Sequence, residues 1–122
     1  MKKKKEPTLK TPIIETIENR YADRKYAINI EFPEFTCVCP KTGLPDFATI
    51  KIEYFPGKLL AELKSLKYYF ISFRNVGIFH ETVINRILDD LVIAVNPKSM
   101  TVCGEFNVRG GIKTTVISRF PI

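Results

Sequence analysis

The sequence lacks the features of a membrane or exported protein. Its longest wholly aliphatic run is Leu91–Val95, which is far too short to span a bilayer. The lysines after Met1 are followed by Glu6 and Pro7, whereas a signal peptide would continue into an apolar segment. The chain has 3 cysteines, and an odd number does not favour a disulfide framework. We therefore expect a cytoplasmic protein with reduced thiols and no membrane contact.

Positive charge is scarce outside the N-terminal tail. Residues 1–10 contain five lysines and one glutamate, so they carry +4 of the net charge of +6 and leave +2 for the rest. The body of the chain is therefore not expected to bind polyanions in general, which still leaves room for a local phosphate site. The composition, 45% hydrophobic and 26% charged over 122 residues, fits one globular domain. We expect a basic tail and loosely packed arm over residues 1–25 and a single domain over residues 26–122.

Alternating apolar and polar residues predict a β-hairpin in the first half of the domain. The alternation runs through Tyr26–Phe32, is interrupted at Pro33, and resumes over residues 35–39. The proline indicates a bulge or an edge strand, because it cannot donate to a ladder. A second alternating segment, Phe47–Phe55, ends at Pro56. The two segments predict an antiparallel pair with residues 39–46 at its tip.

Two helices are predicted in the middle of the chain. From Leu59 the apolar period becomes helical, and this helix is expected to end near Gly77 as a C-cap. The second helix is expected from about His80 to Val95, where Asn96 and Pro97 stop it. The first helix presents an apolar stripe made of Leu59, Leu63, Leu66, Phe70 and Phe73.

Two further alternating segments close the chain. Met100–Val108 and Ile112–Phe120 flank a tight turn at residues 109–111, which contains two glycines. Along the first of these segments, Met100, Val102, Gly104, Phe106 and Val108 share one face. The order strand-strand-helix-helix-strand-strand predicts an α+β fold, a four-stranded antiparallel sheet with both helices on one face.

The loop at the tip of the first hairpin contains two candidate catalytic residues. Cys39 opens it and Asp46 closes it, with two prolines and Gly43 restricting the backbone between them. A rigid loop can hold a nucleophile and a proton donor together. The alternative is a buried, inert cysteine and a turn-forming aspartate. His80, the single histidine, lies beside Glu81 at the start of the second helix and is a further candidate.

A basic helical face is the second candidate feature. Lys64, Lys67 and Arg74 align along the first helix, where they would clamp a phosphorylated cofactor or simply face solvent. Glu62 lies near the start of this helix, and the helix dipole alone would favour a carboxylate there. The chain has no G-x-G-x-x-G motif, so a Rossmann domain does not supply a cofactor site.

Three segments together resemble one family. They are residues 34–50, which include the Cys39–Asp46 loop; residues 62–69, which read E-L-K-S-L-K-Y-Y; and residues 72–75 with Phe79-His80-Glu81. The chain resembles the NADPH-dependent 7-cyano-7-deazaguanine reductases, the nitrile reductases of the queuosine pathway, over residues 25–120. The resemblance implies a tunnelling fold that assembles into rings, with sites at subunit boundaries. It also implies a small-molecule deazapurine substrate and no direct contact with nucleic acid.

The resemblance assigns the chemistry to the loop and the second helix. Cys39 is implied to attack the nitrile as a nucleophile and form a thioimide, while Asp46 handles the proton. His80 would lie beside the nitrile, and Phe79 would pack on the purine-like ring. Glu81 would accept hydrogen bonds from the N–H and NH₂ donors on the edge of the ring.

The remaining implied residues lie in the signature of the first helix. The segment Ala61, Glu62 and Leu63 falls where the family's signature touches substrate, although many members have valine where this chain has Ala61. The cofactor is implied to be NADPH, its phosphates bound by Lys64, Lys67 and Arg109, with Arg109 joining the lysines across a subunit boundary.

The sequence leaves open the role of Cys37 and two other hypotheses for the function. Cys37 lies two residues from Cys39 and is expected on the same face, so it could form a regulatory disulfide or merely fill space. A zinc enzyme related to the tunnelling-fold cyclohydrolases would need Cys37, Cys39, Cys103 and His80 as ligands, without the usual spacing. A non-catalytic RNA-binding module would use the basic tail and the helix face.

Overall fold

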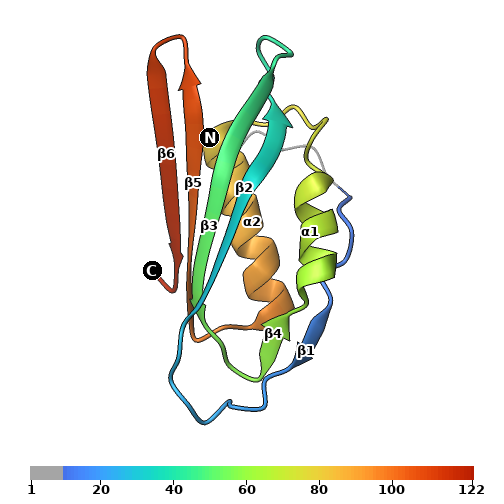
Figure 1. Cartoon of the computed structure of the whole chain (residues 1–122), viewed down its shortest axis with the longest axis vertical. Coiled ribbons are helices and arrows are strands. Elements are labelled where there is room, and N and C mark those ends of the chain that lie inside the picture. Colours follow the sequence, from blue (N-terminus) through green and yellow to red (C-terminus); the bar gives the residue numbers. More distant parts are fainter. Residues whose placement is uncertain (1–9) are drawn as a thin grey trace, which may run out of the picture.

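Four long antiparallel strands form the sheet on which the molecule is built. The computed structural model describes residues 10–122, and the sheet order is β2 (Ile28–Val38), β3 (Pro45–Phe55), β5 (Ser99–Arg109) and β6 (Ile112–Phe120). The helices α1 (Leu63–Ile71) and α2 (His80–Val95) both cover one face of this sheet (Figure 1). The predicted α+β arrangement is confirmed.

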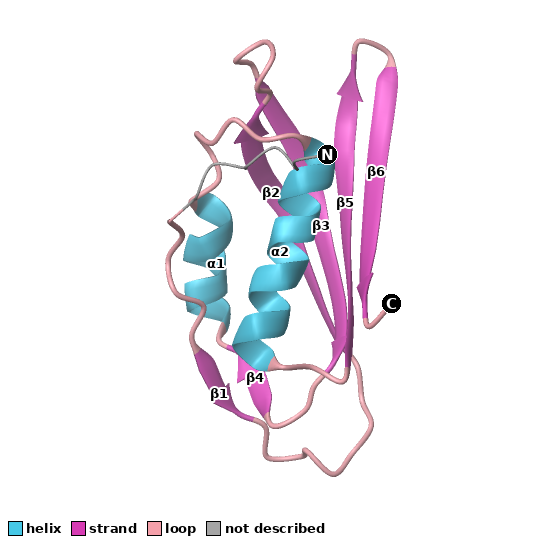
Figure 2. Cartoon of the chain, turned by 180° about the vertical axis from the view of Figure 1, so that it is seen from behind, coloured by secondary structure: helices cyan, strands magenta, loops and turns pink. Residues whose placement is uncertain are grey.

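The core lies between the sheet and the two helices. Ile50, Ile52 and Tyr54 of β3 are buried on the inner face, while Lys51 and Glu53 between them are exposed. Viewed from the helix side, α2 crosses the middle of the sheet and α1 lies beside it (Figure 2). The inward residues of α2 are Val83, Ile84, Ile87, Leu88, Leu91 and Val95, much as the helical period predicts.

The irregularity predicted at Pro33 is present. The pairing of β2 with β3 shifts register between Phe32 and Phe35, and β2 is an edge strand of the sheet. Both observations follow from the missing N–H of the proline, which an edge or a bulge tolerates.

The start of the first helix differs from the prediction. Residues 59–61 form the strand β4 (Leu59–Ala61), which pairs with β1 (Thr16–Glu18) in a second, two-stranded sheet. The helix begins only at Leu63, whose side chain is 62% exposed and does not belong to the core stripe. The arm is also attached more firmly than expected, because Asn19 is buried and its amide donates to the Gly57 carbonyl at 2.7 Å. The lysine-rich start of the tail lies outside the described residues.

The end of the first helix also differs from the prediction. Its C-cap is Ser72 in right-handed conformation, and Gly77 is not a cap. Instead, Gly77 forms a parallel bridge with Val38, supported by bonds from Val38 N to Val76 O at 2.9 Å and from Ile78 N to Val38 O at 3.0 Å. This bridge joins the end of β2 to the segment that leads into α2.

The second hairpin turns through two glycines, as predicted. Gly110 has φ 59° and Gly111 has φ 82°, values that L-residues with side chains rarely adopt. Within residues 10–122, no helix is long and apolar enough to cross a membrane.

Candidate active site

The Cys39 loop is fixed by its own backbone hydrogen bonds. The Cys39 amide donates to the Leu44 carbonyl, and the Gly43 amide donates to the Cys39 carbonyl, both at 2.9 Å. Gly43 has φ 73°, which permits the tight return of the chain. Together with the bridge at Val38, these bonds hold Cys39 at the start of the loop between β2 and β3. This loop lies at the upper end of the sheet in Figure 1.

The environment of the Cys39 thiol favours its ionised form. The Thr42 hydroxyl and the backbone amides of Thr42 and Lys41 hydrogen-bond the sulfur and lower the pKa of Cys39, against opposing effects of desolvation and of Asp46. The thiolate is the nucleophilic form of cysteine. Cys39 is also partly exposed, so it meets the two conditions for a reactive thiol.

Asp46 is buried and engaged on both carboxylate oxygens. It is the first inward-facing residue of β3, and its side chain is only 9% exposed. His80 Nε2 lies 3.1 Å from Asp46 Oδ2, and Arg109 Nη1 donates to Asp46 Oδ1 at 3.1 Å. The carboxylate is therefore held between a histidine and an arginine beside the thiol.

His80 is held in place by a ring as well as by a hydrogen bond. It is the first residue of α2, and its imidazole stacks on Phe106 with centroids 3.7 Å apart and planes inclined by 7°. Phe106 is buried on β5, so the imidazole rests on the core while its Nε2 reaches Asp46. The start of α2, the ends of β3 and β5 and the bridge at Val38 thus lie together around Cys39, Asp46 and His80.

These groups surround a pocket of about 250 Å³. Six of the residues implied by the resemblance line it: Cys39, Asp46, Phe79, His80, Glu81 and Arg109. The sequence predicted no pocket role for the other lining residues, because small polar and aliphatic side chains carry no signal for a pocket. These residues are Pro40, Ile78, Asn107, Ile112 and Thr114.

The residues implied at the start of the first helix lie at the opposite end of the sheet from the Cys39 pocket. The Ala61 amide donates to the Tyr54 hydroxyl at 3.2 Å, and Tyr54 stands eight residues along β3 from Asp46. At about 3.3 Å per residue that separation is about 26 Å. Ala61, Glu62, Leu63 and Lys64 therefore do not meet Cys39 within one chain, as the lower position of β4 in Figure 1 also shows.

Within the chain, Glu62 caps a helix. Its two carboxylate oxygens accept from the amides of Lys64 and Ser65, each at 2.8 Å, and these bonds lower the pKa of Glu62. Lys64 and Lys67 project from the exposed side of α1, as does Arg74 just beyond it. Only Arg109 of the three implied cofactor residues lines the pocket with Cys39.

Cys37 occupies a different environment from Cys39. It is fully buried directly across the ladder from Asp46, and desolvation, with smaller effects of Asp46 and Cys39, raises its pKa to about 12. All three cysteines are free.

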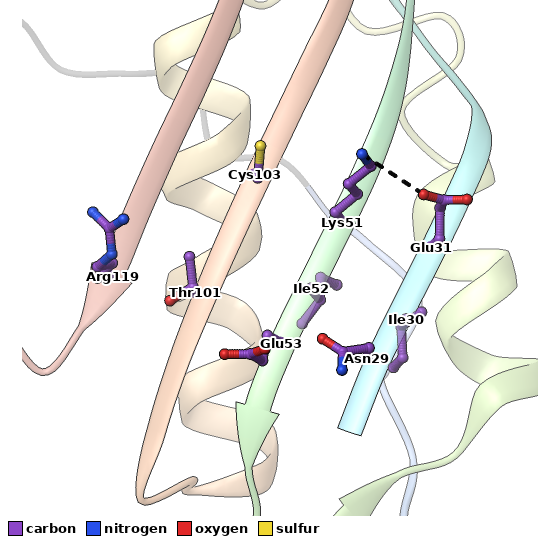
Figure 3. A pocket seen from close by; sticks show the side chains of 9 residues that line it. All are labelled: Asn29, Ile30, Glu31, Lys51, Ile52, Glu53, Thr101, Cys103 and Arg119. Atoms are coloured by element: carbon purple, nitrogen blue, oxygen red, sulfur yellow. Dashed lines mark ion pairs between the residues drawn. The ribbon is translucent and has the colours of Figure 1, made fainter. Parts of the chain in front are cut away.

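The zinc hypothesis is wrong for the part of the chain that the structure describes. Cys103 lies on the outer face of the sheet, where it lines a separate hollow of about 450 Å³ with Lys51, Thr101 and Arg119 (Figure 3). Cys37 and His80 lie on the inner face, so the four ligands do not converge. Within residues 10–122, no cluster of three or more His, Cys, Asp or Glu side chains could hold a metal ion.

Comparison with known proteins identifies the family. A model of the QueF-like protein family matches residues 45–121. The chain belongs to this family. This match, together with the named relatives described next, confirms the resemblance inferred from the Cys39 loop and the two helix segments.

Curated relatives match over nearly their whole length. The chain is 59% identical over 112 residues to a protein of Chloroherpeton thalassium, covering 92% of this chain and 97% of the relative. It is 64% identical over 104 residues to one of Chlorobaculum tepidum, covering 85% and 89%. Both relatives are named NADPH-dependent 7-cyano-7-deazaguanine reductase.

A solved structure confirms the fold. The chain matches the apo form of the archaeosine synthase QueF-Like with a TM-score of 0.72 and 22% identity, covering 76% of this chain and 91% of the other. At 22% identity this likeness supports the tunnelling fold alone. The assignment of site residues depends on the distances and contacts described above.

Proposed function

We propose that the chain reduces the nitrile of 7-cyano-7-deazaguanine to the aminomethyl group of 7-aminomethyl-7-deazaguanine with NADPH. The observation that carries this proposal is one pocket with an activated thiol, Cys39, beside a buried carboxylate, Asp46, in a member of this family. A nitrile is weakly electrophilic, so it needs both a strong nucleophile and a proton for its nitrogen.

The first step is addition of Cys39 across the nitrile. The sulfur bonds to the nitrile carbon while one carbon–nitrogen π bond breaks, giving a covalent thioimide. The thiol proton passes to Asp46 and from Asp46 to the nitrile nitrogen, so the addition needs no external acid. Asp46 suits this role because it lines the same pocket and is held on both oxygens.

Reduction to the amine takes four electrons and therefore two hydrides. NADPH, when bound, supplies one hydride per molecule to the former nitrile carbon. The two hydrides are balanced by two protons, one that completes the amine nitrogen and one that restores the Cys39 thiol, and we assign their delivery to His80 and Asp46, whose polar atoms lie 3.1 Å apart. Cys39 leaves as a thiolate between the two reductions, and its lowered pKa makes that departure easier.

Substrate recognition is assigned to the first turn of α2. Glu81 is exposed at the pocket, where its carboxylate can accept from the N–H and NH₂ groups of the deazaguanine edge. Phe79 is 49% exposed beside it and offers an apolar surface to the ring. We assign Ala61, Glu62 and Leu63 to the same substrate from a neighbouring subunit, because their own chain holds them far from Cys39.

The cofactor site fits NADPH in chemistry but is incomplete in one chain. Lys64, Lys67 and Arg109 are the cations that phosphates prefer, yet the two lysines lie on the surface of α1 and Arg109 lines the pocket. We infer a homo-oligomer, of the ring type that the resemblance implies, in which lysines of one chain serve the Cys39 pocket of another. A pocket of about 250 Å³ is also smaller than most complete ligand sites.

The biological setting follows from the product. We propose that the protein acts in the cytoplasm on the free deazapurine, before the base enters tRNA in queuosine biosynthesis. It then needs no direct contact with nucleic acid.

The test is the stoichiometry of the reaction. Purified protein mixed with 7-cyano-7-deazaguanine and excess NADPH is expected to consume two NADPH for each aminomethyl product, measured by absorbance at 340 nm and by mass spectrometry. NADH in parallel tests the role of the cofactor phosphate. NADPH oxidation that is independent of the nitrile, or none at all, would contradict the proposal.

A further inference from the structure

Arg109 contacts the proposed proton carrier, which a role limited to cofactor phosphates does not explain. Its Nη1 donates to Asp46 Oδ1 at 3.1 Å, while His80 Nε2 lies 3.1 Å from Oδ2. The two bonds engage different oxygens of one carboxylate whose side chain is 9% exposed. A planar carboxylate held at both oxygens has a fixed orientation within the pocket.

The backbone of β5 directs Arg109 to this contact. Strict alternation after Phe106 would place Val108 on the inner face and Arg109 on the outer face. The pairing of β5 with β6 instead shifts register between Phe106 and Arg109, so Val108 is 64% exposed and Arg109 reaches Asp46. Register shifts of this kind re-aim side chains next to active sites.

Arg109 has capacity for a second partner. Its side chain is 43% exposed, and a guanidinium carries five N–H donors, of which the Asp46 contact uses one. It can therefore hold Asp46 while the remaining donors face the open pocket. Contact with a cofactor phosphate does not require it to leave Asp46.

We propose that Arg109 is a positioning residue for Asp46 in the addition of Cys39 to the nitrile, a step that takes place without NADPH. This role rests on the proposed function and deepens it. During the addition, Asp46 takes the thiol proton and gives it to the nitrile nitrogen, and both transfers need the carboxylate in line with its partners. Arg109 supplies the bond that keeps Oδ1 from rotating away.

The test measures the rate of thioimide formation without cofactor. Rapid mixing of the protein with 7-cyano-7-deazaguanine, acid quenching and intact mass give the rate for the wild type, Arg109→Ala and Arg109→Lys. Misplacement of a reacting group slows a step by roughly 10- to 100-fold, which is the loss expected for Arg109→Ala. Arg109→Lys is expected to recover part of the rate, since lysine keeps the charge without the planar fork.

Two controls separate positioning from folding and charge. Lys113→Ala removes a cation from the same hairpin on the outer face, near Glu105, and is expected to leave the adduct rate unchanged. Guanidinium ion added to Arg109→Ala is expected to restore part of the lost rate, a rescue that a misfolded protein would not give.

The outcomes distinguish this inference from the proposed function. A wild-type adduct with a slow, guanidinium-rescued Arg109→Ala variant supports both. Adduct formation at the wild-type rate in Arg109→Ala, with only a higher KM for NADPH, overturns the positioning role and leaves the reductase proposal intact. A slow Arg109→Ala variant without rescue by guanidinium or by lysine also overturns the positioning role. No adduct with the wild-type protein overturns both.

Discussion

At the scale of single residues, two cysteines on one strand end have opposite chemistry. Hydrogen bonds from the Thr42 hydroxyl and nearby amides lower the pKa of Cys39, whereas burial raises the pKa of Cys37 to about 12. Cys37 therefore stays a protonated, inaccessible thiol at neutral pH. This favours packing over a regulatory disulfide as its role in the reduced protein.

Removal of the Thr42 hydroxyl tests the activation of Cys39. Thr42→Val is expected to raise the pKa of Cys39, so the curve of alkylation rate against pH moves to higher pH and the rate at pH 7 falls. Thr42→Ser keeps the hydroxyl and is the matched control. Iodoacetamide labelling followed by peptide mass mapping measures the rate at each cysteine. Faster labelling of Cys37 than of Cys39 in the native protein would contradict the assignment of Cys39 as the reactive thiol.

Glu81 tests the recognition of the substrate edge. Glu81→Gln replaces one acceptor oxygen with a donor, so one buried donor of the bound ligand loses its partner. Such a loss costs about 1–3 kcal/mol. The KM for the nitrile, measured with saturating NADPH, is expected to rise roughly 10- to 100-fold, with a smaller effect on the KM for NADPH. Glu53→Gln, on the exposed outer face, is the control, and equal KM values in both variants would exclude the proposed role.

The residues of the site were only partly predictable from sequence. Cys39, Asp46 and His80 were candidates from their places in the sequence, the resemblance assigned their roles, and the structure brings them to one pocket. The contact of Arg109 with Asp46 was not predicted, because the register shift after Phe106 reverses the face of the sheet on which Arg109 lies. Alternation in a sequence carries no signal for such a shift unless a proline marks it, as Pro33 does in β2.

At the scale of elements, the contact of α2 with the sheet depends on one glycine. A Cβ at Gly104 of β5 would clash with Ile84 Cδ1 and lie 2.8 Å from its Cγ1. The helix that carries His80 therefore approaches the sheet closely only because this position has no side chain. The position of His80 follows from this packing.

Gly104→Ala is expected to destabilise the protein. Overpacking of a core contact costs about 1–3 kcal/mol in the free energy of unfolding. Urea denaturation followed by circular dichroism measures the loss. Ile84→Val removes the nearest atom, so the double variant is expected to recover part of the stability that Gly104→Ala loses. Strictly additive effects of the two substitutions would show that they do not share a contact.

The long elements were predictable because each carries a sustained period. The four long strands alternate over nine or eleven residues, and α2 keeps its apolar stripe over sixteen. The three-residue strands β1 and β4 are too short to show a period. Leu59 and Leu63 also happen to extend the helical stripe of α1, which is why the helix was placed four residues too early.

At the scale of the whole molecule, one chain holds the two halves of the proposed site about 26 Å apart, as judged from eight residues of β3 at about 3.3 Å each. The Cys39 pocket lies at one end of the sheet and the start of α1 at the other. If copies of the chain complete each other's sites, the two halves can be supplied by different chains.

Mixed assemblies test this division. Cys39→Ala lacks the nucleophile, and the double variant Lys64→Ala with Lys67→Ala lacks the cofactor lysines, so each is expected to be nearly inactive alone. Co-expressed in equal amounts, they are expected to regain about a quarter of the wild-type activity, since random pairing joins an intact pocket to intact lysines in that share of sites. Activity no higher than that of the separate variants would place both halves of the site in one chain.

The most direct test of the central claim is the mass of the protein after mixing with 7-cyano-7-deazaguanine in the absence of NADPH. The account predicts an adduct that adds the full mass of the substrate, is absent in Cys39→Ala, and disappears when NADPH is added. An unmodified wild-type mass, or an adduct that persists in Cys39→Ala, would contradict Cys39 as the nucleophile of a nitrile reductase.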